Sequence, residues 1–239
     1  MINTILFDLD GTLLPMDIKV FEKVYFGSLA KHFTDKHDLQ SFVALIWGAT
    51  KTMVANTEHR TNEEVFMEAM QLSVNEQLEE YKKRFSHFYQ TDFDAVRQSV
   101  TKNEDILVAV KMLKEKGYQL VIATNPMFPR LAIEKRIGWA GLDMDDFSYV
   151  TSFEDNHYCK PQPKFYQEVL SEIGKSASEC LMVGNDTVED LIAGKLNIAT
   201  YLIEDHAIVR EQAFEPTYQG SYKDFLIFVN ELPKINETR

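Results

Sequence analysis

INTILFDLDGT, residues 2–12, is the stretch that decides the fold of this chain. Its apolar run is rich in β-branched and aromatic residues and ends abruptly in two carboxylates, Asp8 and Asp10, followed by Gly11 and Thr12. This pattern is typical of a buried β-strand that delivers polar side chains at its C-terminal end. We therefore expect the two aspartates to carry the chemistry of the protein.

The composition is that of a soluble globular protein, with 45% hydrophobic and 26% charged residues. A length of 239 residues suffices for one large domain, or for a core domain that carries a smaller one. The formal net charge of −12 predicts no nucleic-acid surface, because such a field repels phosphate backbones and anionic membranes. A small phosphorylated ligand would need a local positive site and a divalent cation.

The sequence indicates neither a targeting segment nor a membrane segment. No run approaches the ~18 apolar residues of a membrane span, and the N-terminus lacks a basic stretch followed by an apolar run and a cleavage site. Cys159 and Cys180 are too far apart for a CxxC motif and make no disulfide framework. The prediction is a cytoplasmic protein without a membrane partner, whose oligomeric state the sequence leaves open.

Residues 16–96 have the periodicity of helices. Apolar residues recur every three or four positions over 18–29 and 39–47, which is the pattern of amphipathic helices. Capping boxes of the S/T-x-x-E type that begin at Thr61 and Ser73 predict the starts of two more helices. We expect a small helical bundle in this part of the chain.

Strands and helices alternate from Val100 onward. A capping box at Thr101 predicts a helix, and Gly117 ends it. Apolar runs and turn residues predict strands at 119–124, 147–150, 180–184 and 199–203, and helices over 129–137, from 163, over 188–196 and over 222–232. This alternation predicts an α/β fold, a Rossmann-like parallel sheet with helices on both faces. The core domain would comprise residues 1–15 and 97–239, with the all-α unit of residues 16–96 inserted.

Polar residues stand at the C-terminal ends of three predicted strands, where open α/β sheets bind their ligands. They are Asp8 and Asp10, Thr124 and Asn125, and Asn185 and Asp186. Two carboxylates as close as the first pair repel, which raises one pKa or recruits a metal. The motif Asp-x-Asp-Gly also begins calcium-binding loops. An EF-hand, however, needs further oxygen ligands at the positions where Leu13, Leu14 and Pro15 follow here. An exposed acidic loop is the plain alternative.

Two further motifs suit an anion. Thr124 closes its strand with a hydroxyl, and the turn after it exposes backbone amides that suit a phosphate oxygen, although many threonines end strands without such a role. Pro161 moves Lys160 out of helical geometry, and Pro163 suits the first turn of the next helix. Lys160 therefore stands on a stiffened loop as a fixed cation, the alternative being a solvated surface lysine.

The loop 184–190, which reads GNDTVED, follows an apolar strand and enters a helix. Its acids collect at a helix N-terminus, where the macrodipole is positive and a cation could bridge them. The plain alternative is helix capping by Asp186 or Thr187.

The order of these motifs resembles that of the haloacid dehalogenase-like hydrolase superfamily over essentially the whole chain. The resemblance implies that Asp8 is the nucleophile and forms an aspartyl-phosphate. Asp10 would protonate the leaving oxygen and then activate the water that hydrolyses the intermediate. Members that cleave carbon–halogen bonds generally lack this second aspartate, because a halide leaves without a proton. The presence of Asp10 therefore indicates a phosphatase-type member.

The resemblance also implies a binding site for the phosphoryl group and for Mg²⁺. Thr124, Asn125 and Lys160 would hold the phosphoryl group and screen its charge. Mg²⁺ would be held by an oxygen of Asp8 and by the backbone carbonyl of Asp10, together with the loop 184–190.

The loop 184–190 departs from the commonest pattern of the family. Many relatives have Gly-Asp where this chain has Gly184-Asn185-Asp186, so the metal ligand is either Asn185 or Asp186. Asp190 would bind the metal through water or orient Lys160.

Residues 16–96 occupy the place of the family's first-type helical cap, which closes over the site, excludes water and selects the substrate. Trp47, Lys51 and Arg60 would reach substrate from this cap, or serve only packing and surface. The predicted function is Mg²⁺-dependent hydrolysis of a small phosphomonoester metabolite. The alternatives are a phosphomutase of the β-phosphoglucomutase type and a non-catalytic binding module on the same fold.

Overall fold

The computed structural model describes residues 1–235, and its centre is a six-stranded sheet in the order β3-β2-β1-β4-β5-β6. Every neighbouring pair of strands is parallel. The strands are β1 (Thr4–Phe7), β2 (Gln119–Ile122), β3 (Tyr149–Val150), β4 (Cys180–Gly184), β5 (Ala199–Ile203) and β6 (Tyr218–Gly220). The predicted α/β fold with a parallel sheet is confirmed.

Strand β1 lies at the middle of the sheet. Thr4 is in register with Gln119 of β2 on one side and with Cys180 of β4 on the other. Because the three strands are parallel and start level, they also end at the same edge. The segments that follow β1, β2 and β4 therefore emerge side by side.

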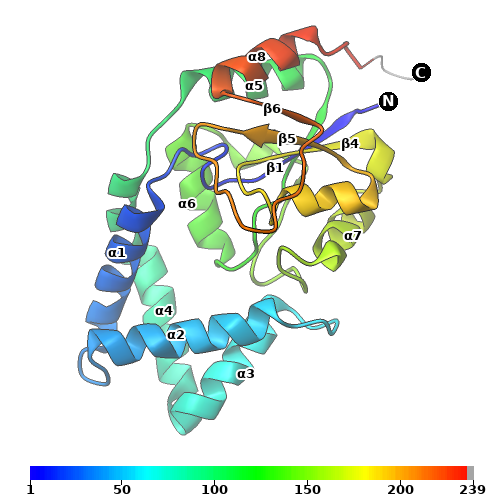
Figure 1. Ribbon diagram of the computed structural model, residues 1–239. Coiled ribbons are helices and arrows are strands. Elements are labelled where there is room, and N and C mark those ends of the chain that lie inside the picture. Colours follow the sequence, from blue (N-terminus) through cyan, green and yellow to red (C-terminus); the bar gives the residue numbers. More distant parts are fainter. Residues whose placement is uncertain (236–239) are drawn as a thin grey trace.

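Helices cover both faces of the sheet, as predicted (Figure 1). Side chains of β1 alternate between the faces, so that Ile5 and Phe7 join one buried cluster and Leu6 joins another. The first face is covered by α5 (Glu104–Glu115), α6 (Arg130–Ala140) and α8 (Tyr222–Glu231), and the second by α7 (Pro163–Glu172) and the short 3₁₀ helix η6 (Leu191–Leu196). Two further 3₁₀ turns are η4 (Met144–Asp146) and η5 (Ala177–Glu179).

The helical insert, residues 16–96, extends from the edge of the sheet at which β1 ends (Figure 1). Its α-helices are α1 (Ile18–Leu29), α2 (Leu39–Val54), α3 (Asn62–Val74) and α4 (Leu78–Thr91), with 3₁₀ helices η1 (Ala30–Phe33) and η2 (Asn75–Gln77), and η3 (Phe93–Ser99) in the return to the core. Stacked rings form its interior, with Phe33 and Phe42 4.7 Å apart between centroids. None of the helices in residues 1–235 combines the length and the hydropathy needed to span a membrane.

The insert is tied to the rest of the chain at several places, two of which lie at its opposite ends. The two linkers run side by side, since Met16 and Val100 form an antiparallel bridge. At the far end, the Gln162 amide donates to the carbonyl oxygens of Val54 (2.6 Å) and Asn56 (2.9 Å). These links hold the insert over the edge of the sheet at which β1 ends.

Two predicted helix starts are wrong. Helix α3 continues past Ser73 to Val74, because Val74 is buried and extends the apolar stripe, and α4 begins only at Leu78. Helix α5 is capped by Asn103, whose side chain accepts from the Ile106 amide (3.2 Å). Thr101 is held extended instead, because its own amide donates to the Pro15 carbonyl.

Candidate active site

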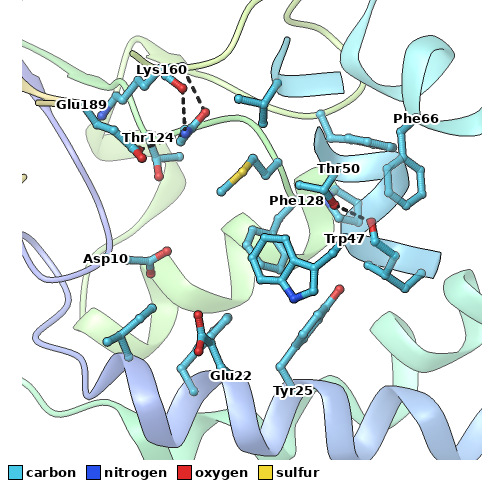
Figure 2. A pocket seen from close by; sticks show the side chains of 18 of the residues that line it. Asp10, Glu22, Tyr25, Trp47, Thr50, Phe66, Thr124, Phe128, Lys160 and Glu189 are labelled. Atoms are coloured by element: carbon cyan, nitrogen blue, oxygen red, sulfur yellow. Dashed lines mark hydrogen bonds between the residues drawn. The ribbon is translucent and has the colours of Figure 1, made fainter. Parts of the chain in front are cut away.

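A cavity of about 1270 Å³ lies between the helical insert and the sheet edge. Its lining includes all eight site residues predicted from the sequence, which are Asp8, Asp10, Thr124, Asn125, Lys160, Asn185, Asp186 and Asp190. Of the three residues predicted in the insert, Trp47 and Lys51 line the cavity. Arg60 is not among the lining residues and pairs with Glu68 (2.6 Å). Figure 2 shows Asp10, Thr124 and Lys160 along one side of the cavity and Trp47 on the other.

Lys160 forms the centre of a buried ion-paired cluster. Its Nζ lies 2.9 Å from Oδ1 of Asp8 and 2.6 Å from Oδ1 of Asp190, and the lysine is only 1% exposed. The second oxygen of Asp190 accepts from the backbone amides of Asn185 and Asp186, both at 2.9 Å. Asp190 therefore fixes the lysine against Asp8 and anchors the loop that follows β4.

Burial and charge set the protonation of this cluster. Burial raises the pKa of Asp8; Lys160 opposes that effect, whereas Asp190 and Asp10 add to it. Burial alone would lower the pKa of Lys160, but the Asp190 and Asp8 carboxylates outweigh it and hold that pKa well above its usual value. The lysine is thus a permanent cation, and Asp8 gains from any further positive charge placed beside it.

Asp10 points to a partner that the sequence did not predict, Arg136 of α6, with which it forms an ion pair. Arg136 is 1% exposed, its Nε donates to the Ala132 carbonyl (3.2 Å), and its guanidinium lies 4.5 Å from the centroid of the Phe128 ring. Within residues 1–235, Oδ1 of Asp10 and Nη2 of Arg136 are buried without a hydrogen-bond partner. Asp10 therefore has one oxygen paired with Arg136 and a second, buried oxygen without a partner among the described residues.

The loop after β4 presents an amide and a carboxylate in different settings. The Asn185 amide oxygen accepts from the Thr12 hydroxyl (3.2 Å), and its Nδ2 donates to the His206 carbonyl (2.8 Å). Gly11 lies against this amide with a φ of +80°, and a Cβ there would overlap Nδ2. Asn185 is thus held directly beside the DxDG turn.

Asp186 is committed to other partners. Its Oδ1 accepts from the backbone amides of Val188 (2.8 Å) and Glu189 (2.9 Å). The Nε of Arg210 donates to both of its oxygens, at 2.9 and 2.7 Å. Arg210 was not predicted from the sequence, since it stands in a loop without a local motif. The Asp186 charge is therefore already compensated by an arginine.

The remaining predicted residues connect the cluster to the cavity. The Asn125 side chain accepts from the Lys160 amide (3.2 Å) and donates to Oε2 of Glu189 (3.0 Å), so it braces the lysine loop. The Thr124 carbonyl accepts from the Thr151 hydroxyl (2.7 Å), while its side chain lines the cavity. The Lys160 ammonium at Asp8 and the Thr124 side chain thus line the same cavity, an arrangement that suits phosphoryl oxygens.

Comparison with known proteins identifies the family of the chain. A family model described as haloacid dehalogenase-like hydrolase matches residues 2–196. The chain belongs to the haloacid dehalogenase-like hydrolase family. The family and the enzyme class, a hydrolase, both predicted from the sequence, are confirmed.

Relatives of this haloacid dehalogenase-like hydrolase match over its full length. The curated pyrophosphatase PpaX of Bacillus anthracis (strain A0248) is 24% identical over 236 residues, 97% of this chain and 98% of that protein. The solved HAD phosphatase from Thermococcus onnurineus has a TM-score of 0.61 at 19% identity and covers 98% of this chain and 100% of its own. The L-2-haloacid dehalogenase from Xanthobacter autotrophicus has a TM-score of 0.61 at 15% identity, with coverages of 97% and 100%. The two solved structures share the fold.

The donors around Asp8 fit a divalent cation of the kind that phosphatases of this family use. The described residues contain no cluster of three or more His, Cys, Asp or Glu side chains arranged for a metal. Lys160 contacts Oδ1 of Asp8 and leaves Oδ2 to other partners, and the Asn185 amide oxygen has a second lone pair. A carboxylate, a backbone carbonyl and an amide oxygen are hard donors, which Mg²⁺ accepts together with water and phosphate.

Proposed function

We propose that this hydrolase is a Mg²⁺-dependent phosphatase that cleaves a small phosphomonoester by way of an aspartyl-phosphate on Asp8. The observation that carries the proposal is the cluster of Asp8, Lys160 and Asp190, which faces the cavity from the ends of the central strands. A fixed cation beside the attacking carboxylate screens its repulsion from the phosphoryl oxygens. The pyrophosphatase name of the curated relatives adds support.

In the proposed reaction, Asp8 attacks the phosphorus and the bond to the leaving oxygen breaks. Asp10 gives that oxygen a proton and then takes a proton from the water that attacks the same phosphorus and frees Asp8. Arg136 pairs with Asp10 and holds its carboxylate in place at the cavity lining. Thr124 and Lys160 bind the phosphoryl oxygens, and Asn125 fixes the loop of Lys160.

Asp8, the Asp10 carbonyl and Asn185 are the proposed Mg²⁺ ligands. Asn185 is preferred to Asp186, because Arg210 already neutralises Asp186. When bound, Mg²⁺ would screen the phosphoryl charge and favour the ionised form of Asp8.

We further propose that residues 16–96 act as a substrate-selecting cap on a core domain of residues 1–15 and 97–239. The paired linkers at Met16 and Val100 and the lining position of Trp47 and Lys51 support this division. A cytoplasmic location stays a prediction from the sequence.

The two alternative functions are less well supported. A phosphomutase would need polar partners for the hydroxyls of a sugar, whereas the insert side of the cavity is lined mainly by aromatic and aliphatic side chains. A non-catalytic binding module gives no reason to retain Asp8, Asp10, Thr124 and Lys160 together in one cavity.

Hydrolysis of 4-nitrophenyl phosphate with and without Mg²⁺ tests the proposal. We expect turnover that needs the metal, is lost in Asp8→Asn, and is unchanged in Asp145→Asn, which alters an exposed aspartate that does not line the cavity. Turnover that survives Asp8→Asn would remove the proposed nucleophile.

A further inference from the structure

Aromatic side chains make up a large part of the cavity lining. Nine aromatic residues line the cavity, which are Phe21, Tyr25, Phe26, Trp47, Phe66, Phe85, Tyr89, Phe128 and Phe153. Figure 2 shows Tyr25, Trp47, Phe66 and Phe128 gathered on the side away from Lys160 and Thr124. We call these nine residues the aromatic pocket.

The two tyrosine hydroxyls of the aromatic pocket are already paired with each other. The hydroxyls of Tyr25 and Tyr89 are hydrogen-bonded at 2.8 Å, and the nearby Thr50 hydroxyl donates to the Ile46 carbonyl at 2.9 Å. A ligand with many hydroxyl groups would lose its hydration here without gaining equivalent partners. The pocket therefore suits an apolar group.

The charge of the lining disfavours a second anionic group. Eight carboxylates and only four lysine or arginine side chains line the cavity within the described residues. Lys160 is paired with Asp8 and Asp190, Arg210 with Asp186 and Glu189, and Lys82 with Glu79, so that among the described residues only Lys51 of the four cations has no carboxylate partner. One bound divalent cation offsets two of the excess negative charges, and this is enough for a single phosphoryl group.

The size of the cavity exceeds what a phosphate needs. At about 1270 Å³ it is larger than the ~300–1,000 Å³ typical of small-molecule pockets. The phosphoryl site at Asp8 and the aromatic pocket are parts of this one cavity. A substrate with its phosphorus at Asp8 thus has its leaving group in the aromatic pocket.

We propose that the aromatic pocket selects phosphomonoesters whose leaving group is an uncharged, apolar alcohol or phenol, and that pyrophosphate and other substrates with a second anionic group are poor substrates. This inference rests on the proposed phosphatase function. It also distinguishes the substrate proposed for this chain from pyrophosphate, the substrate for which the curated relatives are named.

A series of 4-alkylphenyl phosphates tests the inference, because lengthening the alkyl chain barely changes the acidity of the leaving phenol. With Mg²⁺ present, we expect kcat/KM to rise about two- to fourfold for each added methylene group until the pocket is full. Pyrophosphate and glycerol phosphate should have values at least about tenfold below that of 4-butylphenyl phosphate.

Trp47 variants locate the effect. Trp47 is 42% exposed, so Trp47→Ala can fold, and it should flatten the dependence on alkyl length, while Trp47→Phe restores most of it. Leu72→Ala is the matched control, since Leu72 lies in the same insert, is 81% exposed and does not line the cavity. A dependence that persists unchanged in Trp47→Ala would overturn the assignment to this pocket.

The outcomes separate the two proposals. Mg²⁺-dependent hydrolysis with no dependence on alkyl length, or with a preference for pyrophosphate or glycerol phosphate, overturns the inference and leaves the phosphatase proposal intact. If phosphate is released from none of these compounds, the phosphatase proposal itself is overturned.

Discussion

Replacing Lys160 by methionine should strongly destabilise the protein, because it leaves two buried carboxylates facing each other. The side chains of Lys160, Asp8 and Asp190 are 1%, 12% and 2% exposed. Breaking a buried ion pair by removing one partner costs about 3–5 kcal/mol. Since ~1 kcal/mol shifts the melting temperature of a chain of this size by about 2–4 °C, we expect Lys160→Met to melt roughly 6–20 °C lower.

The loss of stability in Lys160→Met should depend on pH. Burial already raises the pKa of Asp8 above its value in the unfolded chain, and removing the lysine that opposes this effect raises it further. A carboxyl group whose pKa is raised on folding contributes stability that is fully present when the pH is below its pKa in the unfolded chain, about 3.9. This contribution is lost as the pH rises through the pKa of the folded state. We therefore expect the stability difference between wild type and Lys160→Met to be larger at pH 8 than at pH 5.

Thermal unfolding of wild type and variant at these two pH values measures the effect. Lys111→Met is the control, because the Lys111 side chain is 79% exposed and should leave the melting temperature nearly unchanged. The double variant Asp8→Asn with Lys160→Met should recover part of the loss, since one of the two facing charges is gone. A deficit of less than about 1 kcal/mol, or one of equal size at both pH values, would refute the reasoning.

Three further predictions concern the loop after β4 and the general acid. Asn185→Asp adds a carboxylate and should lower the half-saturating Mg²⁺ concentration about tenfold, whereas Asp186→Asn should change it less than about twofold. A larger change in Asp186→Asn than in Asn185→Asp would assign the metal to Asp186. Asp10→Asn should release one equivalent of nitrophenol from 4-nitrophenyl phosphate in a burst and then turn over about 10²–10⁴ times more slowly, and a steady rate near that of wild type would contradict its role with water. Gly184→Ala should lower the free energy of unfolding by about 1–3 kcal/mol and remove most of the activity, because its Cβ would overlap the Asp190 carboxylate. Gly194→Ala is the control, since a Cβ there would face open space and should be tolerated. Equal melting temperatures of the two variants would argue against this packing.

The fold was predictable where long apolar runs or local turn signals exist. The strands at Cys180–Gly184 and Ala199–Ile203 have the predicted bounds, because each is a mainly apolar run that stops at a polar residue, Asn185 and Glu204 respectively. Strand β6, Tyr218–Gly220, was missed, since it is a three-residue edge strand with two exposed residues. The helix expected over 188–196 is a 3₁₀ helix limited to Leu191–Leu196, because Asp190 is turned back to the loop amides and to Lys160.

The site was predictable to the extent that topology determines it. Parallel strands that start level also end level, so the motifs after β1, β2 and β4 had to meet at one edge. Arg136 and Arg210 were missed for a physical reason. Each pairs with an acid far away in sequence, 126 positions from Asp10 for Arg136 and 24 from Asp186 for Arg210, and no local pattern encodes such a contact.

Chemical trapping of the intermediate tests the central claim most directly. The enzyme would be mixed with Mg²⁺ and an aryl phosphate, quenched within a turnover, reduced with borohydride and digested for tandem mass spectrometry. Reduction converts an aspartyl-phosphate to homoserine, so the account predicts homoserine at position 8, dependent on substrate and absent from Asp8→Asn. Homoserine at another aspartate, or none at position 8 while the nitrophenol burst is complete, would contradict it.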